Sequence, residues 1–230
     1  MKYSVLVPNI FNHPFTYESE IKLNIGDYVK VPFGKATITG VVWDEFEKSN
    51  SKNFKIRKIF KKIDAEPLRK ETIGFLKWFS EYNLVPLGMS LKLHLLSGEA
   101  STSYDNNDYK IYNKKKDKKF FDLSSEQNKI LREVQKKTNE FRVHLLQGTT
   151  GSGKTIIYFK TIEKVLKEGR QALILVPEIG LTRQFEKKFK EFFGFSAAVW
   201  HSGITPKKKK IIWSGLASNK INVTIGARSS

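Results

Sequence analysis

Eight consecutive residues of the chain have the types and the spacing needed to hold phosphate groups. They are Gly148, Thr149, Thr150, Gly151, Ser152, Gly153, Lys154 and Thr155. In the pattern G-x-x-x-x-G-K-[ST], the glycines let backbone N–H groups turn toward the phosphates of a nucleotide. The lysine neutralises the β- and γ-phosphates, and the last hydroxyl coordinates Mg²⁺. The motif predicts a nucleoside triphosphate site, for ATP, with Lys154 and Thr155 as its catalytic side chains.

Two acidic or amide side chains bear on how this site would work. Gln127 precedes the loop, and its amide can pair with the edge of adenine; the alternative is an ordinary surface residue of a helix. Hydrolysis also needs an acidic residue at the end of a second strand, to hold Mg²⁺. No aspartate follows Asp122 in the sequence. Glu178 is the only acidic candidate that follows an apolar strand, and it comes too early in the chain to be this Mg²⁺ ligand. We therefore expect the chain to be the front portion of a longer protein, with little turnover of its own.

The elements that must position the loop alternate between strands and helices. Expected strands cover 141–146, 171–176, 196–200 and 221–226, and expected helices cover 124–137, 154–168, 179–193 and 206–217. A strand before the loop and a helix after it are the context that the motif requires, and they disfavour a chance glycine-rich turn. Alternating strands and helices predict a parallel sheet covered on both faces, so the fold class is α/β.

The N-terminal part has a different pattern. Residues 3–7, 28–33 and 36–43 have the β-branched and aromatic composition of short strands. A helix is expected over 68–82, with one apolar face formed by Leu68, Phe75, Leu76, Phe79 and Tyr82. We predict a small β-rich domain over 1–100, a basic polar linker over 101–119, and an incomplete nucleotide-binding domain over 120–230.

The charge of the chain points to a polyanionic partner. The formal net charge is +18, of which residues 1–105 carry +3 and residues 106–230 carry +15. Lysine outnumbers arginine 34 to 7, so codon bias is an alternative source of the excess. The concentration of charge in the half with the nucleotide loop favours binding of nucleic acid there.

Several classes of site and location are disfavoured. The chain has no cysteine, which excludes disulfides and thiolate zinc sites within it, and its four histidines show no metal-ligand spacing. No apolar run approaches the length of about 18 residues that can span a membrane. The N-terminus does not have the pattern of a secretory signal. The default expectation is a cytoplasmic protein without a membrane partner.

Four segments in order resemble one protein family. Residues 145–155 read LLQGTTGSGKT, 175–182 read LVPEIGLT, 201–203 read HSG, and 225–229 read IGARS. Together they resemble the PriA family of bacterial replication-restart helicases. Residues 13–17 (HPFTY) and 29–35 (VKVPFGK) resemble the same family's domain for DNA 3′ ends. The resemblance covers essentially the whole chain and corresponds to the first part of a full family member.

The resemblance implies a superfamily 2 helicase that uses ATP and Mg²⁺ and moves 3′ to 5′ on DNA. Its motor domain is RecA-like. It would recognise stalled forks, single strands and 3′ ends. Its protein partners would be other primosome proteins and the single-stranded-DNA-binding protein. The second motor lobe, the acidic Mg²⁺ motif and a zinc module would lie beyond Ser230.

The resemblance also implies two sets of DNA contacts. In the motor domain they are Pro177, Glu178, Thr182, Arg228 and Ser229, which places Glu178 in a strand-binding motif and not on Mg²⁺. In the 3′-end domain they are Phe15, Thr16, Gly34 and Arg57. Phe15 would stack on the terminal base, Gly34 would allow a close approach, and Arg57 would meet phosphate. The family usually has aspartate where Thr16 stands, which weakens the expected contact with a 3′-hydroxyl. Phe15 in the core and Gly34 in a simple turn are the structural alternatives.

This chain departs from the family pattern in one further way. The interval between the two domains is too short for the winged-helix module that family members commonly have. A different P-loop enzyme, of the restriction or nucleotide-kinase type, is a second hypothesis. A DNA-end-binding module with a non-hydrolysing nucleotide site is a third.

Overall fold

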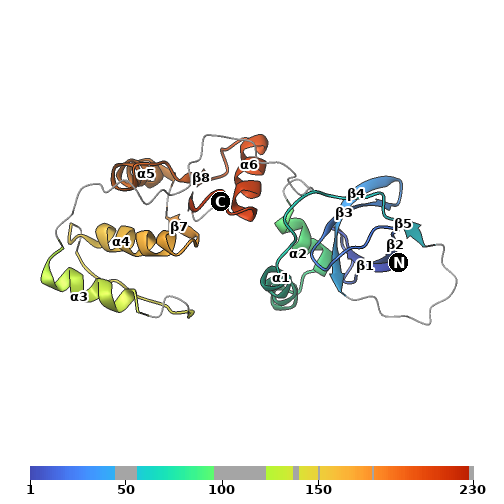
Figure 1. Cartoon of the computed structure of the whole chain (residues 1–230), viewed down its shortest axis with the longest axis horizontal. Coiled ribbons are helices and arrows are strands. Elements are labelled where there is room, and N and C mark those ends of the chain that lie inside the picture. The colour runs from blue at the N-terminus through green and yellow to red at the C-terminus, as the bar shows by residue number, and fades with distance from the viewer. Residues whose placement is uncertain (45–55, 96–122, 137–139, 150, 178, 228–230) are drawn as a thin grey trace. The chain divides into compact units, whose positions relative to one another are not determined.

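The computed structural model describes residues 1–44, 56–95, 123–136, 140–149, 151–177 and 179–227 (Figure 1). It divides into two compact units, Met1–Tyr104 and Asp105–Ser230. Each unit is described separately below. The predicted linker, 101–119, lies outside the described residues.

The first unit is built on a six-stranded sheet. Its strands are β1 (Lys2–Leu6), β2 (Phe15–Glu18), β3 (Tyr28–Phe33), β4 (Ala36–Asp44), β5 (Arg57–Lys58) and β6 (Lys61–Lys62). Their order across the sheet is β5-β2-β1-β4-β3-β6, and the pairing is antiparallel except between β2 and β5. The predicted strands β1, β3 and β4 are confirmed, whereas the three short strands were not predicted.

The sheet is held together by the apolar residues of its longer strands, which share one buried cluster. Val29 and Val31 of β3 pack with Val5 and Val42 in one buried cluster. The β3–β4 turn is closed at Gly34, whose φ of +60° lies in the left-handed region that glycine adopts without strain. Phe33 of β3 pairs with Ala36 of β4, so the two residues between them form the turn.

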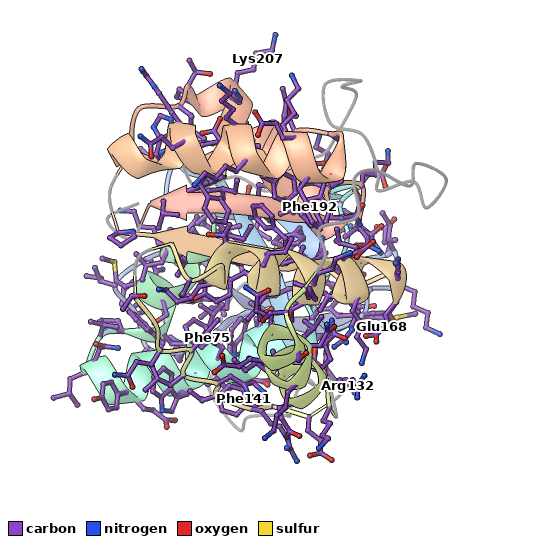
Figure 2. All side chains as sticks on the ribbon, turned by 90° about the vertical axis from the view of Figure 1, so that its left-hand side faces the viewer. Phe75, Arg132, Phe141, Glu168, Phe192 and Lys207 are labelled. Carbon is purple, nitrogen blue, oxygen red and sulfur yellow. The ribbon has the colours of Figure 1, made fainter. Side chains whose placement is uncertain are left out.

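Two helices, α1 (Lys70–Asn83) and α2 (Leu87–His94), complete the unit. The helix expected over 68–82 is confirmed, but its expected apolar face is partly wrong. The buried residues of α1 are Ile73, Leu76 and Ser80, while Phe75 is exposed (Figure 2) and so is Tyr82. When a helix has two apolar faces, the periodicity of its sequence does not indicate which face packs against the core.

The second unit contains four helices and three strands among its described residues. They are α3 (Ser125–Val134), α4 (Lys154–Lys167), β7 (Ala172–Val176), α5 (Ile179–Phe193), β8 (Ala198–Trp200), α6 (Pro206–Ala217) and β9 (Val223–Ala227). The strand order is β7-β9-β8 and both pairings are parallel, as predicted. After β7 the chain passes the position of the central strand β9 to form β8, and it then returns to form β9. Right-handed connections in the two directions put α5 and α6 on opposite faces of the sheet.

The core between the helices and one face of the sheet is rich in aromatic residues. Phe159 of α4 contacts Phe189 and Phe193 of α5 at ring-centroid distances of 5.9 and 5.6 Å. These rings pack with Val223 and Ile225 of β9. The start of α4, which follows the nucleotide loop, is thereby anchored to the sheet through α5.

The strand expected over 141–146 does not form. Residues 140–149 have no strand pairing, and Phe141, Val143 and Leu145 are all exposed (Figure 2 labels Phe141). Leu173 and Leu175 leave one face of β7 exposed as well. Alternating apolar residues are compatible with a strand, but a strand also needs a partner edge and a cover for its apolar face. In the described part of the chain, this segment pairs with no strand, and its apolar side chains are uncovered.

Candidate functional site

The nucleotide loop runs into α4 in the conformation that its glycines allow. Gly151 and Gly153 both have φ of +85°, and α4 begins at Lys154 directly after Gly153. No side chain caps this helix start, so its first N–H groups remain available to an anion. The helix expected over 154–168 is confirmed as α4, Lys154–Lys167. Thr150 lies outside the described residues.

Lys154 folds back over the loop. Its Nζ donates hydrogen bonds to the carbonyl oxygens of Gly148 and Thr149 at 2.5 and 2.7 Å. The Ser152 N–H donates to the Thr149 carbonyl at 3.3 Å, which closes the turn. The ammonium group therefore lies inside the curve of the loop. A bound phosphate needs a positive charge at this position, so the loop residues fit a nucleotide.

Gln127 joins α3 to the nucleotide loop. Its Nε2 donates to the Ser152 carbonyl at 3.2 Å. Its Oε1 accepts from the Ser124 N–H at 3.0 Å, while the Ser124 hydroxyl accepts from the Gln127 N–H at 3.2 Å. The last two bonds form a capping box at the start of α3. A Cβ on Gly153 would come within 2.3 Å of the Gln127 amide nitrogen and would displace it from the loop, and the φ of +85° favours glycine at this position.

A cavity of about 710 Å³ adjoins the loop. Gln127, Gly153, Lys154 and Thr155 line one side of it. Three residues of α5 line the other side: Lys188, Glu191 and Phe192. Phe192 lies against Phe159 of α4 at 5.2 Å between ring centroids, and it is labelled in Figure 2. Sequence reasoning missed this wall, because nothing in α5 resembles a nucleotide motif.

In the first unit, three ring side chains gather around Phe15. The ring of Phe15 lies 5.4 Å from Phe11, 4.8 Å from His13 and 5.3 Å from Phe33, measured between centroids. Phe15 is half-buried against the core, and Phe11 is 42% exposed. The sequence predicted Phe15 alone. Phe11 and His13 precede Phe15 in the same stretch of chain, whereas Phe33 ends β3 and is brought close by the β2-β1-β4-β3 strand order.

Gly34 and Arg57 meet beside this aromatic cluster. The Arg57 guanidinium donates to the Gly34 carbonyl at 3.1 Å, and both residues are exposed. Gly34 directly follows Phe33, so the cluster and the guanidinium occupy one region. A Cβ on Gly34 would meet nothing within 4 Å, so open space lies in front of this turn. Burial raises the pKa of the nearby Tyr17 hydroxyl, and the charge of Arg57 opposes that shift.

Thr16 does not share the face of Phe15. Consecutive side chains of a strand point to opposite faces, so Phe15 faces the aromatic cluster while the exposed Thr16 faces away. On the outer edge of β2, β5 pairs at Tyr17 and Glu18. A ligand that stacks on Phe15 would have to pass around the strand to reach the Thr16 hydroxyl. Three of the four predicted residues therefore gather, and the fourth is separated from them.

Of the DNA contacts predicted in the motor unit, the structure describes the side chain of Pro177 alone. Pro177 is exposed and follows the last residue of β7. The side chains of Glu178 and Thr182, and residues Arg228 and Ser229, lie outside the described residues. The register Val176↔Ala227 brings the ends of β7 and β9 side by side. The two predicted segments are thus neighbours at one edge of the sheet.

The comparisons with known proteins agree with both units. A family model described as "3'DNA-binding domain (3'BD)" of PriA matches residues 4–95, and one described as "Type III restriction enzyme, res subunit" matches 120–230. The replication restart protein PriA of Rickettsia conorii is 37% identical over 229 residues, covering 97% of this chain and 34% of that protein. The chain belongs to the PriA family. PriA of Bacillus subtilis is 46% identical over 93 residues, covering 40% of this chain and 12% of that protein.

A more distant relative covers nearly the same extent. PriA of Haemophilus influenzae is 28% identical over 301 residues, covering 99% of this chain and 41% of that protein. This PriA-family chain therefore spans about a third of the length of the Rickettsia relative that it matches. Among its described residues, no group of acidic and histidine side chains is arranged to hold a metal ion, and none of the helices is long and apolar enough to cross a bilayer.

Proposed function

We propose that this chain supplies the ATP-binding and DNA-binding part of a 3′-to-5′ DNA helicase of replication restart. Residues 1–100 would bind DNA 3′ ends, 101–119 would connect the domains, and 120–230 would form part of the motor. The observation that carries the proposal is the nucleotide loop, in which Lys154 lies inside the loop at the uncapped start of α4. The family membership supports the link to replication restart.

The loop residues have separate roles in this proposal. Lys154 leaves the carbonyls of Gly148 and Thr149 and pairs with phosphate oxygens, so the loop opens as nucleotide binds. Backbone N–H groups at the start of α4 donate to the phosphates, and the Thr155 hydroxyl holds Mg²⁺. Gln127 keeps the Ser152 carbonyl in place and can offer its remaining N–H and lone pair to adenine. When bound, ATP would supply the phosphoryl group that is transferred to water, and Mg²⁺ would neutralise the charge on the phosphates.

The aromatic cluster supports a role in holding an unpaired base. Stacking of a base on an aromatic ring contributes about 1–3 kcal/mol. Phe11, Phe15 and Phe33 offer ring surface, and Arg57 sits close enough to meet the phosphate of a stacked nucleotide. The partners of the whole helicase would be forked and single-stranded DNA, other primosome proteins and the single-stranded-DNA-binding protein.

The test of this proposal is nucleotide and DNA binding by the chain and by Lys154→Ala. We expect the parent to retain labelled ATP on a filter and the variant to lose it, with unchanged circular dichroism. Lys167→Ala, at the far end of the same helix, is the matched control and should bind like the parent. Equal retention by parent and Lys154→Ala would show that the loop is not the site.

A further inference from the structure

Four consecutive lysines open helix α6. Lys207, Lys208, Lys209 and Lys210 follow Pro206, and the first turn of the helix contains no acidic residue. Lys207 and Lys208 are exposed, and Figure 2 shows Lys207 pointing outward from the ribbon. In the described part of the chain, neither Lys207 nor Lys208 forms an ion pair. The positive charge of these two side chains is thus directed to solvent.

The position of this lysine patch follows from the sheet. β8 is parallel to β9 with Trp200 opposite Gly226, and β7 is parallel to β9 with Val176 opposite Ala227. All three strands therefore end at the same edge. Helix α6 starts there, because it follows the carboxyl end of β8 and returns antiparallel to the sheet. Ligands of open parallel sheets bind outside this edge.

The connection between β8 and the lysines is held by local bonds. The Gly203 N–H donates to His201 Nδ1 at 3.0 Å, and the Ile204 N–H donates to the His201 carbonyl at 3.3 Å. The Thr205 hydroxyl caps α6 by accepting from the Lys208 N–H at 3.3 Å. Lys209 lies over the Trp200 ring, with its Nζ 5.8 Å from the centroid. These contacts fix the direction in which the lysine patch faces.

We propose that Lys207 and Lys208 contact the phosphates of a DNA single strand that crosses the carboxyl edge of the sheet. The inference rests on the proposed function, which places DNA at the ends of β7 and β9, and extends that path to the end of β8. Lysine ammonium groups pair with phosphate as point charges without reading sequence. The contact should therefore contribute affinity and salt dependence, and no base preference.

The experiment measures the affinity of the full chain for a circular oligothymidine at a series of salt concentrations. A circle has no 3′ end, so the proposed end site of the first unit does not contribute. The variant is Lys207→Gln with Lys208→Gln. The control is Lys187→Gln with Lys190→Gln, which removes the same charge from exposed positions in the C-terminal half of α5, toward the opposite edge of the sheet. Glutamine and lysine have similar helix propensity, so both helices should persist.

Each lost phosphate contact on a single strand lowers the slope of log affinity against log salt by about 0.7. We expect the α6 variant to lose about 1.4 from the slope, and the α5 control to keep the slope of the parent. Equal changes in the two variants would overturn the inference, since they would reflect total charge alone. An unchanged slope in the α6 variant, with the parent still bound to the circle, would overturn it and leave the proposed function standing. A parent that binds linear 3′-ended DNA but no circle would contradict both DNA paths in the motor unit.

Discussion

Replacing Gln127 with alanine separates two roles that the structure allows for its amide. One is structural: Nε2 holds the Ser152 carbonyl, and Oε1 completes the cap of α3. The other is recognition of adenine through the remaining N–H and lone pair. Loss of the first role affects every ligand that has a triphosphate. Loss of the second affects ATP alone.

The size of each effect follows from the bonds involved. A neutral hydrogen bond contributes about 0.5–1.5 kcal/mol, which corresponds to roughly 2- to 12-fold in affinity. Loss of the bond to Ser152 should weaken inorganic triphosphate, GTP and ATP by this factor. Loss of adenine pairing should weaken ATP by roughly the same factor again. Loss of the capping box should also lower the free energy of unfolding by about 1 kcal/mol.

The assay is competition against a fluorescent ATP analogue by triphosphate, GTP and ATP. Ser124→Ala is the control, because it removes the cap of α3 but keeps the Gln127 amide beside the loop. We expect Ser124→Ala to lower stability without changing the ratio of ATP to GTP affinity. An identical loss for all three ligands in Gln127→Ala would refute the adenine role. Unchanged triphosphate affinity would refute the role of Gln127 in holding the loop.

Three other perturbations test the first unit. Phe15→Ala should weaken binding to a 3′-hydroxyl oligonucleotide by about 1–3 kcal/mol through loss of stacking, and Thr16→Ala should change it little, because Thr16 lies on the opposite face of β2; fluorescence anisotropy that ranks the two variants in the opposite order would contradict this. Burial lowers the pKa of His94, whose Nε2 lies 2.8 Å from the Tyr28 hydroxyl. The unfolded chain therefore binds more protons below pH 6.5, so the free energy of unfolding should fall as the pH drops below that value, and this fall should be absent in His94→Gln. Gly26→Ala should cost at least about 2 kcal/mol in urea unfolding, since φ is +94° and the new Cβ would lie 2.3 Å from a backbone oxygen.

Apart from the strand expected over 141–146, the helices and strands of the motor unit could be predicted closely, because local signals agreed there. Helix α5 covers 179–193 and α6 covers 206–217, as expected from periodicity and caps. The glycine-rich loop fixed the start of α4 at Lys154. In the first unit, the two-residue strands β5 and β6 carry no periodic pattern and exist through pairing with β2 and β3. Such strands follow from tertiary contacts and are not encoded locally.

The candidate site was predictable where one segment supplies all its groups. The nucleotide loop meets this condition, and so does the capping box that includes Gln127. The aromatic cluster does not, since Phe33 of β3 is distant in sequence from Phe11 and Phe15. The opposite orientation of Thr16 follows from strand β2, which the sequence did not reveal. Because strand β2 was not predicted, Phe15 and Thr16, which are adjacent in the sequence, were expected to contact the same ligand.

The absence of a strand over 141–146 changes which contacts support the nucleotide loop. In the described chain, residues 140–149 enter the loop without pairing to β7, so the first half of the loop gains no support from the sheet. The second half is held from α3, by the bond from Gln127 to the Ser152 carbonyl. Phe159, one turn into α4, ties the helix after the loop to α5. The position of the phosphate-binding N–H groups in this chain therefore depends on α3 and α5. A single amide at Gln127 can thus affect both stability and nucleotide affinity.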